Sequence, residues 1–342
     1  MKSIKKMAIV SFALVVLVLP MLAACAAPAP AETIKWKCPG TFPAIEWHVD
    51  GIWLPLMDEV YEKTNGKLEI TLYPGGELGY PPNEMLRFLR DGEIPMAELL
   101  FPSMEGEFPL GNFCMLPFIS EGADDWTEVV LPIWEDVTRE PLEKDWNAIA
   151  LINFPFPPSH IFSQGEPLNS IEAFKGRTLR HYGGYMADIF KEVGASSTYM
   201  VSAEVYMAYQ RGIIDGGPTS WASAKAQRLP EVLEWCTECG MVIPQLTLGV
   251  NKDAFDALPG DVRKVLLEVV QEWQGKALGI NKAAEKEAKA YCVEHGIQVV
   301  QMPPDVLQEL REISEPMWAK WAEKAGPLGQ EALDRLAKAR GK

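Results

Sequence analysis

Residues 34–73 of the chain have the sequence IKWKCPGTFPAIEWHVDGIWLPLMDEVYEKTNGKLEITLY. The stretch begins and ends with short apolar runs typical of β-strands, and apolar side chains recur at helical spacing between residues 53 and 63. Beyond it, residues 82–91 predict a second helix and residues 96–101 a third strand. The resulting β-α-β-α-β order predicts a parallel sheet with helices packed on its faces.

A second series of alternating segments follows. An apolar strand over residues 148–154 runs into Phe154-Pro155-Phe156-Pro157-Pro158, where the prolines predict a rigid crossing segment rather than strand interior. A short buried strand is expected at 213–215, and a very long helix over 259–294. Two β/α halves joined by crossings predict a cleft between two lobes, because strand ends and domain interfaces are favoured ligand positions.

The N-terminus has the pattern of an export signal. Three lysines precede an apolar run over residues 7–21, which is short for a membrane span of roughly 20 residues. Residues 22–25, Leu-Ala-Ala-Cys, resemble the bacterial lipobox, in which the cysteine becomes lipidated. We therefore expect residues 1–24 to be a lipoprotein signal peptide, and residues 25–32 to be the lipidated Cys25 and a flexible tether. An ordinary signal peptide with an incidental cysteine is the alternative.

The composition is that of an acidic chain with enough apolar residues for a full core. Apolar residues make up 48% of it, and the formal net charge of −15 becomes −18 once the three lysines of the signal are removed. This charge argues against nucleic acid or an anionic lipid surface as a partner. No second apolar run has the length of a span, so we expect a lipid anchor at the periplasmic or outer face of the cell membrane.

Enzyme signatures are scarce. The sequence has no GxSxG, P-loop or HExxH pattern, and none of its four histidines pairs with another at metal-ligand spacing. Cys236 and Cys239 have the spacing of a redox or zinc half-site, but no second such pair accompanies them, so buried thiols are the ordinary interpretation. We therefore expect no catalytic residue, no metal and no cofactor.

Arg180 ends the expected strand Thr178-Leu179-Arg180 and is followed by His181-Tyr182-Gly183-Gly184. A strand end that faces a cleft is a position for a ligand contact, and a guanidinium grips a carboxylate through two parallel bonds. On these grounds alone, a surface arginine is the default interpretation and a ligand contact is the alternative.

The segment from Leu168 to Trp221 resembles the solute-receptor subunits of tripartite ATP-independent periplasmic (TRAP) transporters. The matching pieces are Phe174-Lys175-Gly176-Arg177-Thr178-Leu179-Arg180, Ala203-Glu204-Val205-Tyr206 and Gln210-Arg211-Gly212-Ile213-Ile214-Asp215-Gly216. Outside it the agreeing pieces are His48, Thr64-Asn65-Gly66, Pro74-Gly75-Gly76-Glu77-Leu78-Gly79, Leu116-Pro117-Phe118, Val250-Asn251-Lys252 and Leu258-Pro259. Each piece is weak, but their order and spacing across nearly the whole mature chain are specific.

The resemblance implies an α/β fold of the periplasmic-binding-protein type, with two lobes, a hinged cleft and a long helix that spans both lobes. The expected first lobe comprises residues 33–156 plus 246–285, and the second comprises 157–245 plus 286–342. The family's carboxylate-binding arginine falls on Arg180, which implies an organic-acid ligand and integral-membrane transporter subunits as partners. When the cleft closes and excludes water, the electrostatic attraction between such a guanidinium and a carboxylate becomes stronger, because the local dielectric constant is lower.

The chain departs from the family pattern at three positions of the expected cleft. His160 stands in place of a second common arginine, Thr219 in place of an asparagine, and Ser202 in place of a frequent tryptophan. These departures weaken the case for the family's usual C4-dicarboxylate ligand.

Aromatic and neutral polar residues are expected to line the cleft instead. Besides Arg180, the candidate ligand-binding residues are Trp47, His48, Phe101, Ser103, Phe156, His160, Tyr182, Thr219, Trp221 and Gln245. Core packing is the alternative for each aromatic side chain. As a set they predict a monocarboxylate with an apolar or aromatic body, because aromatic rings favour flat apolar ligands.

The leading interpretation is an extracytoplasmic receptor that captures a small organic acid by cleft closure and delivers it to TRAP membrane subunits. Two other functions stay open. A binding protein of an ABC importer or sensor system would have the same kind of chain, and neighbouring genes would distinguish it. A secreted enzyme acting on a carboxylate would need a nucleophile–base pair or a metal set, which these residues do not assemble.

Overall fold

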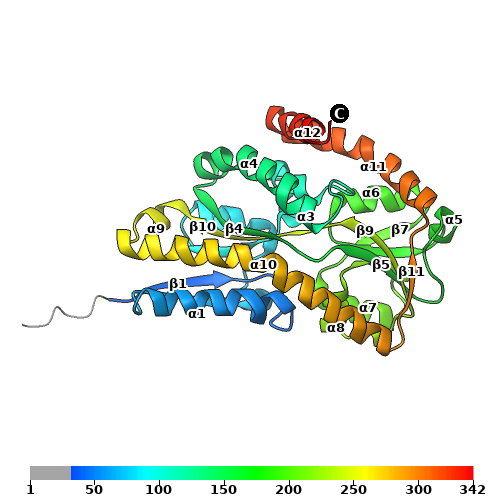
Figure 1. Cartoon of the computed structure of the whole chain (residues 1–342), viewed down its shortest axis with the longest axis horizontal. Coiled ribbons are helices and arrows are strands. Elements are labelled where there is room, and N and C mark those ends of the chain that lie inside the picture. The colour runs from blue at the N-terminus through cyan, green and yellow to red at the C-terminus, as the bar shows by residue number, and fades with distance from the viewer. Residues whose placement is uncertain (1–31, 342) are drawn as a thin grey trace, which may run out of the picture. The chain divides into compact units, whose positions relative to one another are not determined.

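The computed structural model describes residues 32–341 of the chain, coloured from blue to red in Figure 1. The predicted signal peptide, Cys25 and nearly all of the predicted tether lie outside the described residues. Among the helices of residues 32–341, none combines the length and apolar character that crossing a bilayer requires.

The first two strands pair in parallel, as the sequence predicts. They are β1 (Ile34–Pro39) and β2 (Leu68–Tyr73), and α1 (Leu54–Lys63) packs against β2. The expected third strand, β3 (Met96–Leu99), instead pairs antiparallel with β10 (Gln245–Asn251). The prediction of one parallel sheet is therefore wrong for β3, because its hydrogen-bonding partner comes from a distant part of the chain that local periodicity does not reveal.

Two further sheets complete the strand arrangement. A three-stranded sheet has the order β3-β10-β4, in which β4 (Ala148–Pro155) is antiparallel to β10. A six-stranded sheet has the order β11-β9-β5-β8-β6-β7. Its strands, in chain order, are β5 (Ser159–Ser163), β6 (Thr178–His181), β7 (Ser196–Tyr199), β8 (Gly216–Thr219), β9 (Trp235–Val242) and β11 (Gln298–Gln301).

Two short crossings join the smaller sheets, which form the first lobe, to the six-stranded sheet of the second. One is the predicted proline-rich segment at residues 156–158, between β4 and β5, and the other lies between β9 and β10. The crossings touch each other, since Phe156 N donates a hydrogen bond of 2.6 Å to Pro244 O. The lobes therefore meet at a double connection.

Strand β8 consists of Gly216-Gly217-Pro218-Thr219, whereas the sequence predicted a strand at 213–215. A Cβ atom on Gly216 would lie 2.7 Å from Phe162 O, and one on Gly217 would lie 2.9 Å from Arg180 O. The two glycines are thus required because β8 lies tightly between β5 and β6. A glycine-proline segment becomes a strand here because its neighbours hold it there, against its own weak β-propensity.

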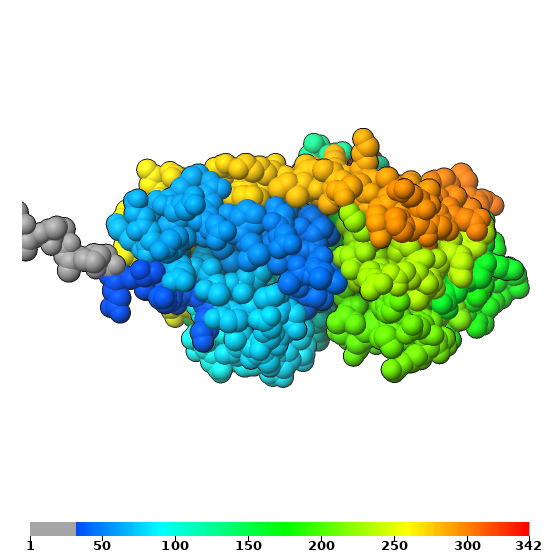
Figure 2. Space-filling view, turned by 90° about the horizontal axis from the view of Figure 1, so that it is seen from below, coloured from blue at the N-terminus to red at the C-terminus, as the bar shows by residue number. Residues whose placement is uncertain are grey.

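The predicted long helix is α10 (Gly260–Glu294), with 35 residues. It packs on α1 and β4 in one half and on α8 (Trp221–Ala226) in the other. Figure 2 shows it in yellow and orange along both the blue N-terminal part and the green middle part of the chain. One helix therefore contacts both lobes.

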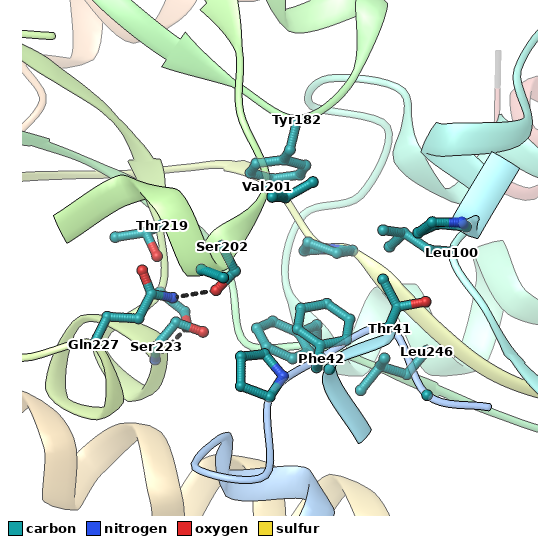
Figure 3. Close-up of a pocket in the computed structure, with 18 of the residues that line it drawn as sticks. Thr41, Phe42, Leu100, Tyr182, Val201, Ser202, Thr219, Ser223, Gln227 and Leu246 are labelled. Carbon is teal, nitrogen blue, oxygen red and sulfur yellow. Dashed lines mark hydrogen bonds between the residues drawn. The ribbon is translucent and has the colours of Figure 1, made fainter. Parts of the chain in front are cut away.

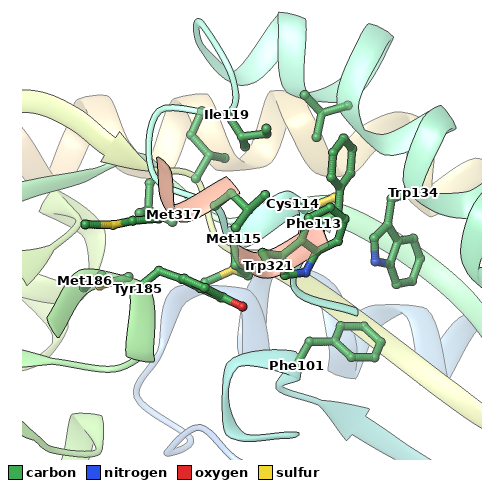
Figure 4. Packing of buried hydrophobic residues seen from close by; sticks show 14 of the residues in the cluster. Phe101, Phe113, Cys114, Met115, Ile119, Trp134, Tyr185, Met186, Met317 and Trp321 are labelled. Atoms are coloured by element: carbon green, nitrogen blue, oxygen red, sulfur yellow. The ribbon is translucent and has the colours of Figure 1, made fainter. Parts of the chain in front are cut away.

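The two closing helices pack across the molecule. They are α11 (Pro304–Ala325), which contacts α6 (Gly184–Glu192), and α12 (Pro327–Ala339), which contacts α4 (Leu131–Asp145). Trp321 is fully buried against Phe113 in the core shown in Figure 4. Because these helices contact elements of both halves, the exact lobe boundaries given above stay a prediction.

The remaining α-helices of the described chain are short. They are α2 (Met85–Arg90), α3 (Ala123–Asp125), α5 (Ile171–Phe174), α7 (Val205–Gln210) and α9 (Lys252–Asp256).

Candidate ligand cavity

A cavity of about 400 Å³ lies where the two crossings meet, with residues of both lobes around it. This volume is in the range of small-molecule sites. Most of its lining is apolar or aromatic: Phe42, Pro43, Tyr80, Pro82, Leu100, Met115, Phe156, Tyr182, Tyr199, Val201, Ala203, Pro244 and Leu246. Phe42 and Phe156 stack with their ring centroids 5.6 Å apart and form an aromatic part of the cavity wall. Figure 3 shows this apolar side next to a group of polar side chains.

Arg180 on β6 is the cation of the cavity lining. Its Nε donates to Met200 O and its Nη1 to Pro218 O, both at 3.0 Å, and its guanidinium lies 4.7 Å from the ring centroid of Tyr182. Only 7% of the residue is exposed, and this burial lowers the pKa of Arg180, though a guanidinium remains charged at neutral pH. In the described chain its hydrogen-bond partners are these carbonyls, and no acidic side chain forms an ion pair with it.

A polar wall, formed by Ser202, Ser223 and Gln227, faces the cavity from the second lobe. All three contact Glu46, a residue of the first lobe that is 1% exposed. Glu46 Oε1 accepts hydrogen bonds of 3.1 Å from Ser202 Oγ and from Gln227 Nε2, and Oε2 accepts one of 3.0 Å from Ser223 Oγ. Gln227 Nε2 also donates to Ser202 Oγ at 2.7 Å.

The sequence interpretation missed most of this polar wall. The signal it did contain was Ser202, noted as a departure from a frequent tryptophan. Nothing in the sequence indicated that Glu46 would be buried at the site, because an acidic residue in a loop, here next to Trp47, is ordinarily exposed to solvent.

The structure places five of the predicted residues in the cavity lining, namely Arg180, Phe156, Tyr182, Thr219 and Gln245. They come from β6 and the residue after it, β8, β10 and the first crossing, which converge only in the folded chain. Their contact with a ligand stays a prediction.

His48 and Trp47 lie behind the lining rather than in it. His48 is fully buried, with Nε2 3.2 Å from Glu98 Oε1. Glu98 also accepts hydrogen bonds from Trp53 Nε1 at 2.8 Å and from the backbone N–H of Thr41 at 2.7 Å. Burial opposes the ionisation of Glu98, but the hydrogen bonds from these neighbours outweigh it and keep the pKa of Glu98 below its usual value. The cluster of His48, Trp53 and Glu98 therefore does not line the cavity itself. It holds the backbone of Thr41, which does.

Phe101 and Ser103 also lie outside the cavity lining. Phe101 is fully buried in the core, with its ring centroid 5.3 Å from that of Trp134. Ser103 Oγ lies 3.5 Å from the hydroxyl of Tyr199, which does line the cavity. Packing in the core accounts for Phe101, and Ser103 lies at the rim of the cavity.

His160 and Trp221 lie outside the cavity lining, in a second polar cluster with Glu238. His160 Nδ1 accepts from the backbone N–H of Cys239 and Gly240, and burial lowers the pKa of His160 to about 4. Trp221 Nε1 donates to Glu238 Oε1 at 2.9 Å. The structure therefore gives both side chains partners other than a ligand in the cavity.

The thiols of Cys236 and Cys239 are free, and burial raises the pKa of both, that of Cys239 to about 12. No cluster of metal-ligating side chains occurs among residues 32–341.

A largely apolar cavity between two α/β lobes, lined by a buried cation that forms no ion pair within residues 32–341, is typical of proteins that bind a small anionic solute. Residues 47–325 match the family described as bacterial extracellular solute-binding protein, family 7 (DctP), and the chain belongs to this family. The membership confirms the predicted resemblance to TRAP receptors and the expectation of a receptor rather than an enzyme.

Solved structures share the fold. The structure of DctP6 of Bordetella pertussis, an extracytoplasmic solute receptor binding pyroglutamic acid, matches with a TM-score of 0.83 and 24% identity, over 89% of this chain and all of that one. A marine metagenome TRAP solute-binding protein specific for pyroglutamate matches with a TM-score of 0.81 and 25% identity, over 90% of this chain and 99% of that one. These likenesses confirm the predicted α/β fold with its long helix.

Among curated relatives, the sialic acid-binding periplasmic protein SiaP of Vibrio cholerae is 24% identical over 317 residues, 92% of this chain and 95% of its own length. The C4-dicarboxylate-binding periplasmic protein DctP of the same organism is 24% identical over 283 residues, 82% of this chain and 84% of its own. The family thus includes receptors for different acids.

Proposed function

We infer that this protein is an extracytoplasmic TRAP receptor that binds one small organic acid in the cavity, with the ligand carboxylate on Arg180. The observation that carries the proposal is a buried guanidinium at the cavity that forms no ion pair with an acidic side chain of the described chain. A buried charge without a partner is costly, so an anionic ligand would supply the missing stabilisation. Binding would thereby be coupled to closure of the cleft.

The rest of the cavity favours a monocarboxylate with an apolar or aromatic body. The stacked rings of Phe42 and Phe156 form an aromatic part of the wall, and Arg180 is the single cationic residue of the described lining. Solved structures with the same fold hold benzoate and metahydroxyphenylacetate, which are acids of this kind, and others hold more polar acids, namely pyroglutamate, orotic acid, galacturonate and glucuronate. A second carboxylate would find no second guanidinium here, since His160 occupies the position of the family's other arginine.

The proposal extends to location and delivery. A mature chain tethered through a lipid on Cys25 would hold the receptor next to its membrane subunits, which the family membership implies. Labelling cells with a radioactive fatty acid tests the anchor: label is expected on the intact protein, and its persistence on Cys25→Ser would contradict the anchor without affecting the binding proposal.

Replacing Arg180 tests the binding proposal directly. Arg180→Ala is expected to abolish binding of acids that stabilise the protein in a thermal-shift panel. Arg180→Lys is expected to weaken it by about a hundredfold, because a lysine keeps the charge but not the bidentate geometry. Isothermal titration calorimetry of both variants measures the effect.

Arg211→Lys, on an exposed residue of the same lobe, serves as the control and is expected to leave affinity unchanged. Binding of the true solute by Arg180→Ala with unchanged affinity would overturn the proposed function.

A further inference from the structure

The hydrogen atoms of the polar wall are all donated away from the cavity. Ser202 and Ser223 give their hydroxyl hydrogens to Glu46. Gln227 gives its two amide hydrogens to Glu46 and to Ser202 Oγ. A serine hydroxyl has one hydrogen and a glutamine amide has two, so no hydrogen of this wall remains for a ligand.

What remains on the polar wall is a set of acceptors. They are the second lone pair of Ser202 Oγ, whose first accepts from Gln227 Nε2, the lone pairs of Ser223 Oγ and the carbonyl oxygen of Gln227. Thr219, next to them in the lining, has a hydroxyl that is able to donate or accept. The wall as a whole therefore favours a ligand group that brings its own hydrogen.

Gln245 follows the same pattern on another side of the cavity. Its amide nitrogen donates to Asn153 Oδ1 at 3.2 Å and to Thr247 Oγ1 at 3.0 Å, which uses both hydrogens. Its Oε1 is buried and has no hydrogen-bond partner within residues 32–341. Such an unpartnered acceptor is costly, but the oxygen itself is fully buried, so a ligand donor reaches it only if the Gln245 side chain turns toward the cavity.

Glu46 is the cause of this polarity. Three donors converge on its two oxygens, as suits an ionised carboxylate, which only accepts. Arg180, elsewhere in the same lining, only donates. The cavity thus has a donor pole at Arg180 and an acceptor pole in front of Glu46.

We propose that Glu46 is a specificity-determining residue: by holding the hydrogens of Ser202, Ser223 and Gln227, it selects acids whose body carries an N–H or O–H donor. The same arrangement disfavours dicarboxylates, because a second carboxylate at the acceptor pole would face lone pairs and a buried negative charge. This inference rests on the proposed function, since it takes Arg180 as the site of the ligand carboxylate.

Matched pairs of acids test the selection. One pair is pyroglutamate and 5-oxotetrahydrofuran-2-carboxylate, in which an oxygen replaces the lactam N–H. The other pair is 3-hydroxyphenylacetate and 3-fluorophenylacetate, with succinate as the dicarboxylate. Calorimetry should show the wild-type protein binding the donor-bearing member of a pair about tenfold more tightly, and succinate more weakly than either.

Glu46→Gln is the decisive variant. Its amide brings hydrogens of its own, so at least one wall hydroxyl must accept from it and turn its hydrogen to the cavity. The preference within a pair is then expected to fall by about tenfold or to reverse, with binding of succinate improved. Glu204→Gln, an exposed change close to Ser202, is the control and should leave all preferences unchanged.

Ser223→Ala provides a second variant if Glu46→Gln does not fold. It removes an acceptor, so it should weaken the donor-bearing acid and leave its acceptor-only partner unaffected. An unchanged preference in the foldable variants, with binding still lost in Arg180→Ala, would overturn the role of Glu46 and leave the proposed function standing. Failure of every acid in the panel to bind the wild-type protein would overturn both.

Discussion

At the scale of single residues, the cavity depends on two buried charges that are held by neutral groups. Arg180 is fixed by two backbone carbonyls, and Glu46 by two hydroxyls and an amide. Neutral partners satisfy hydrogen bonds without cancelling charge, so each group keeps an electrostatic influence on the cavity. A direct ion pair between the two would have removed the attraction for an anionic ligand.

Glu98 is the residue that holds the loop that follows β1. It receives hydrogen bonds from the backbone N–H groups of Thr41 and Phe42, which line the cavity, and from the side chains of His48 and Trp53. Glu98→Gln places an amide NH2 against these donors, which leaves buried donors unsatisfied. We expect the free energy of unfolding to fall by about 3 kcal/mol and ligand affinity to fall with it.

Urea denaturation and calorimetry measure these two effects of Glu98→Gln. The matched control is Glu323→Gln, on an exposed face of α11, for which neither quantity should change. A loss of stability without loss of affinity would show that the loop tolerates the change and that Glu98 serves the core alone.

At the scale of elements, Glu285 of α10 holds the start of α8. Glu285 accepts hydrogen bonds from the backbone N–H of Trp221 at 3.1 Å and of Ala222 at 2.9 Å, at the start of α8. Burial raises the pKa of Glu285 from 4.5 to about 7. Since α8 carries Ser223 of the polar wall, this contact links the long helix to the cavity.

The raised pKa gives a stability change of definite sign. Between about pH 4.5 and about pH 7 the folded state keeps a proton on Glu285 that the unfolded state has lost, so stability falls as pH rises through this window. Glu285→Gln carries no titrating group, and the variant should gain up to about 3 kcal/mol relative to the wild type across the window. Urea denaturation at several pH values measures the difference.

Comparison with the wild type is needed because His160 acts in the opposite direction. Its lowered pKa makes the unfolded state take up a proton between about pH 6.5 and about pH 4, so its contribution grows as pH rises. The same His160 is present in both proteins, so its effect cancels in the difference. Glu294→Gln, an exposed change on α10, is the control, and parallel stability curves for Glu285→Gln and the wild type would refute the prediction.

At the scale of the whole molecule, the lobes are joined by two crossings and by the middle of α10. Asn281 on α10 donates to Pro155 O at 2.7 Å, which ties the helix to the end of β4, next to the first crossing. Gly275 and Gly279 lie just before it, and a Cβ on either would meet no atom within 4 Å. Neither glycine is required by close packing, and glycines inside a helix favour bending.

Replacing both glycines tests whether α10 bends during closure. Gly275→Ala with Gly279→Ala should raise the free energy of unfolding by about 1–2 kcal/mol, because alanine is the better helix former. If α10 bends as the cleft closes, the variant should also show a smaller ligand-induced decrease in radius of gyration by small-angle X-ray scattering. Greater stability with unchanged compaction would mean that α10 moves as a rigid rod.

Local sequence patterns were sufficient for part of the site and misleading for another part. Arg180 was found from its strand end and its family motif, and Phe156 from the proline-rich crossing. His48 and Trp221 were expected in the cavity, but the structure pairs His48 with Glu98 and Trp221 with Glu238. Each partner lies at least 17 residues away along the chain, and no periodicity encodes such a pairing.

The first β-α-β-α-β series, the long helix α10, the proline crossing and the family were determined by the sequence alone, because these depend on local propensity, apolar periodicity and motif spacing. The pairing of β3 with β10, the strand character of Gly216–Thr219 and the position of Glu46 behind the polar wall were decided only by the tertiary structure. The physical reason is that hydrogen bonds and close contacts between remote segments form only when the chain is folded. The type of a side chain fixes which hydrogen-bond donors and acceptors it carries. The residues that surround it in the folded chain decide which of these groups face the cavity.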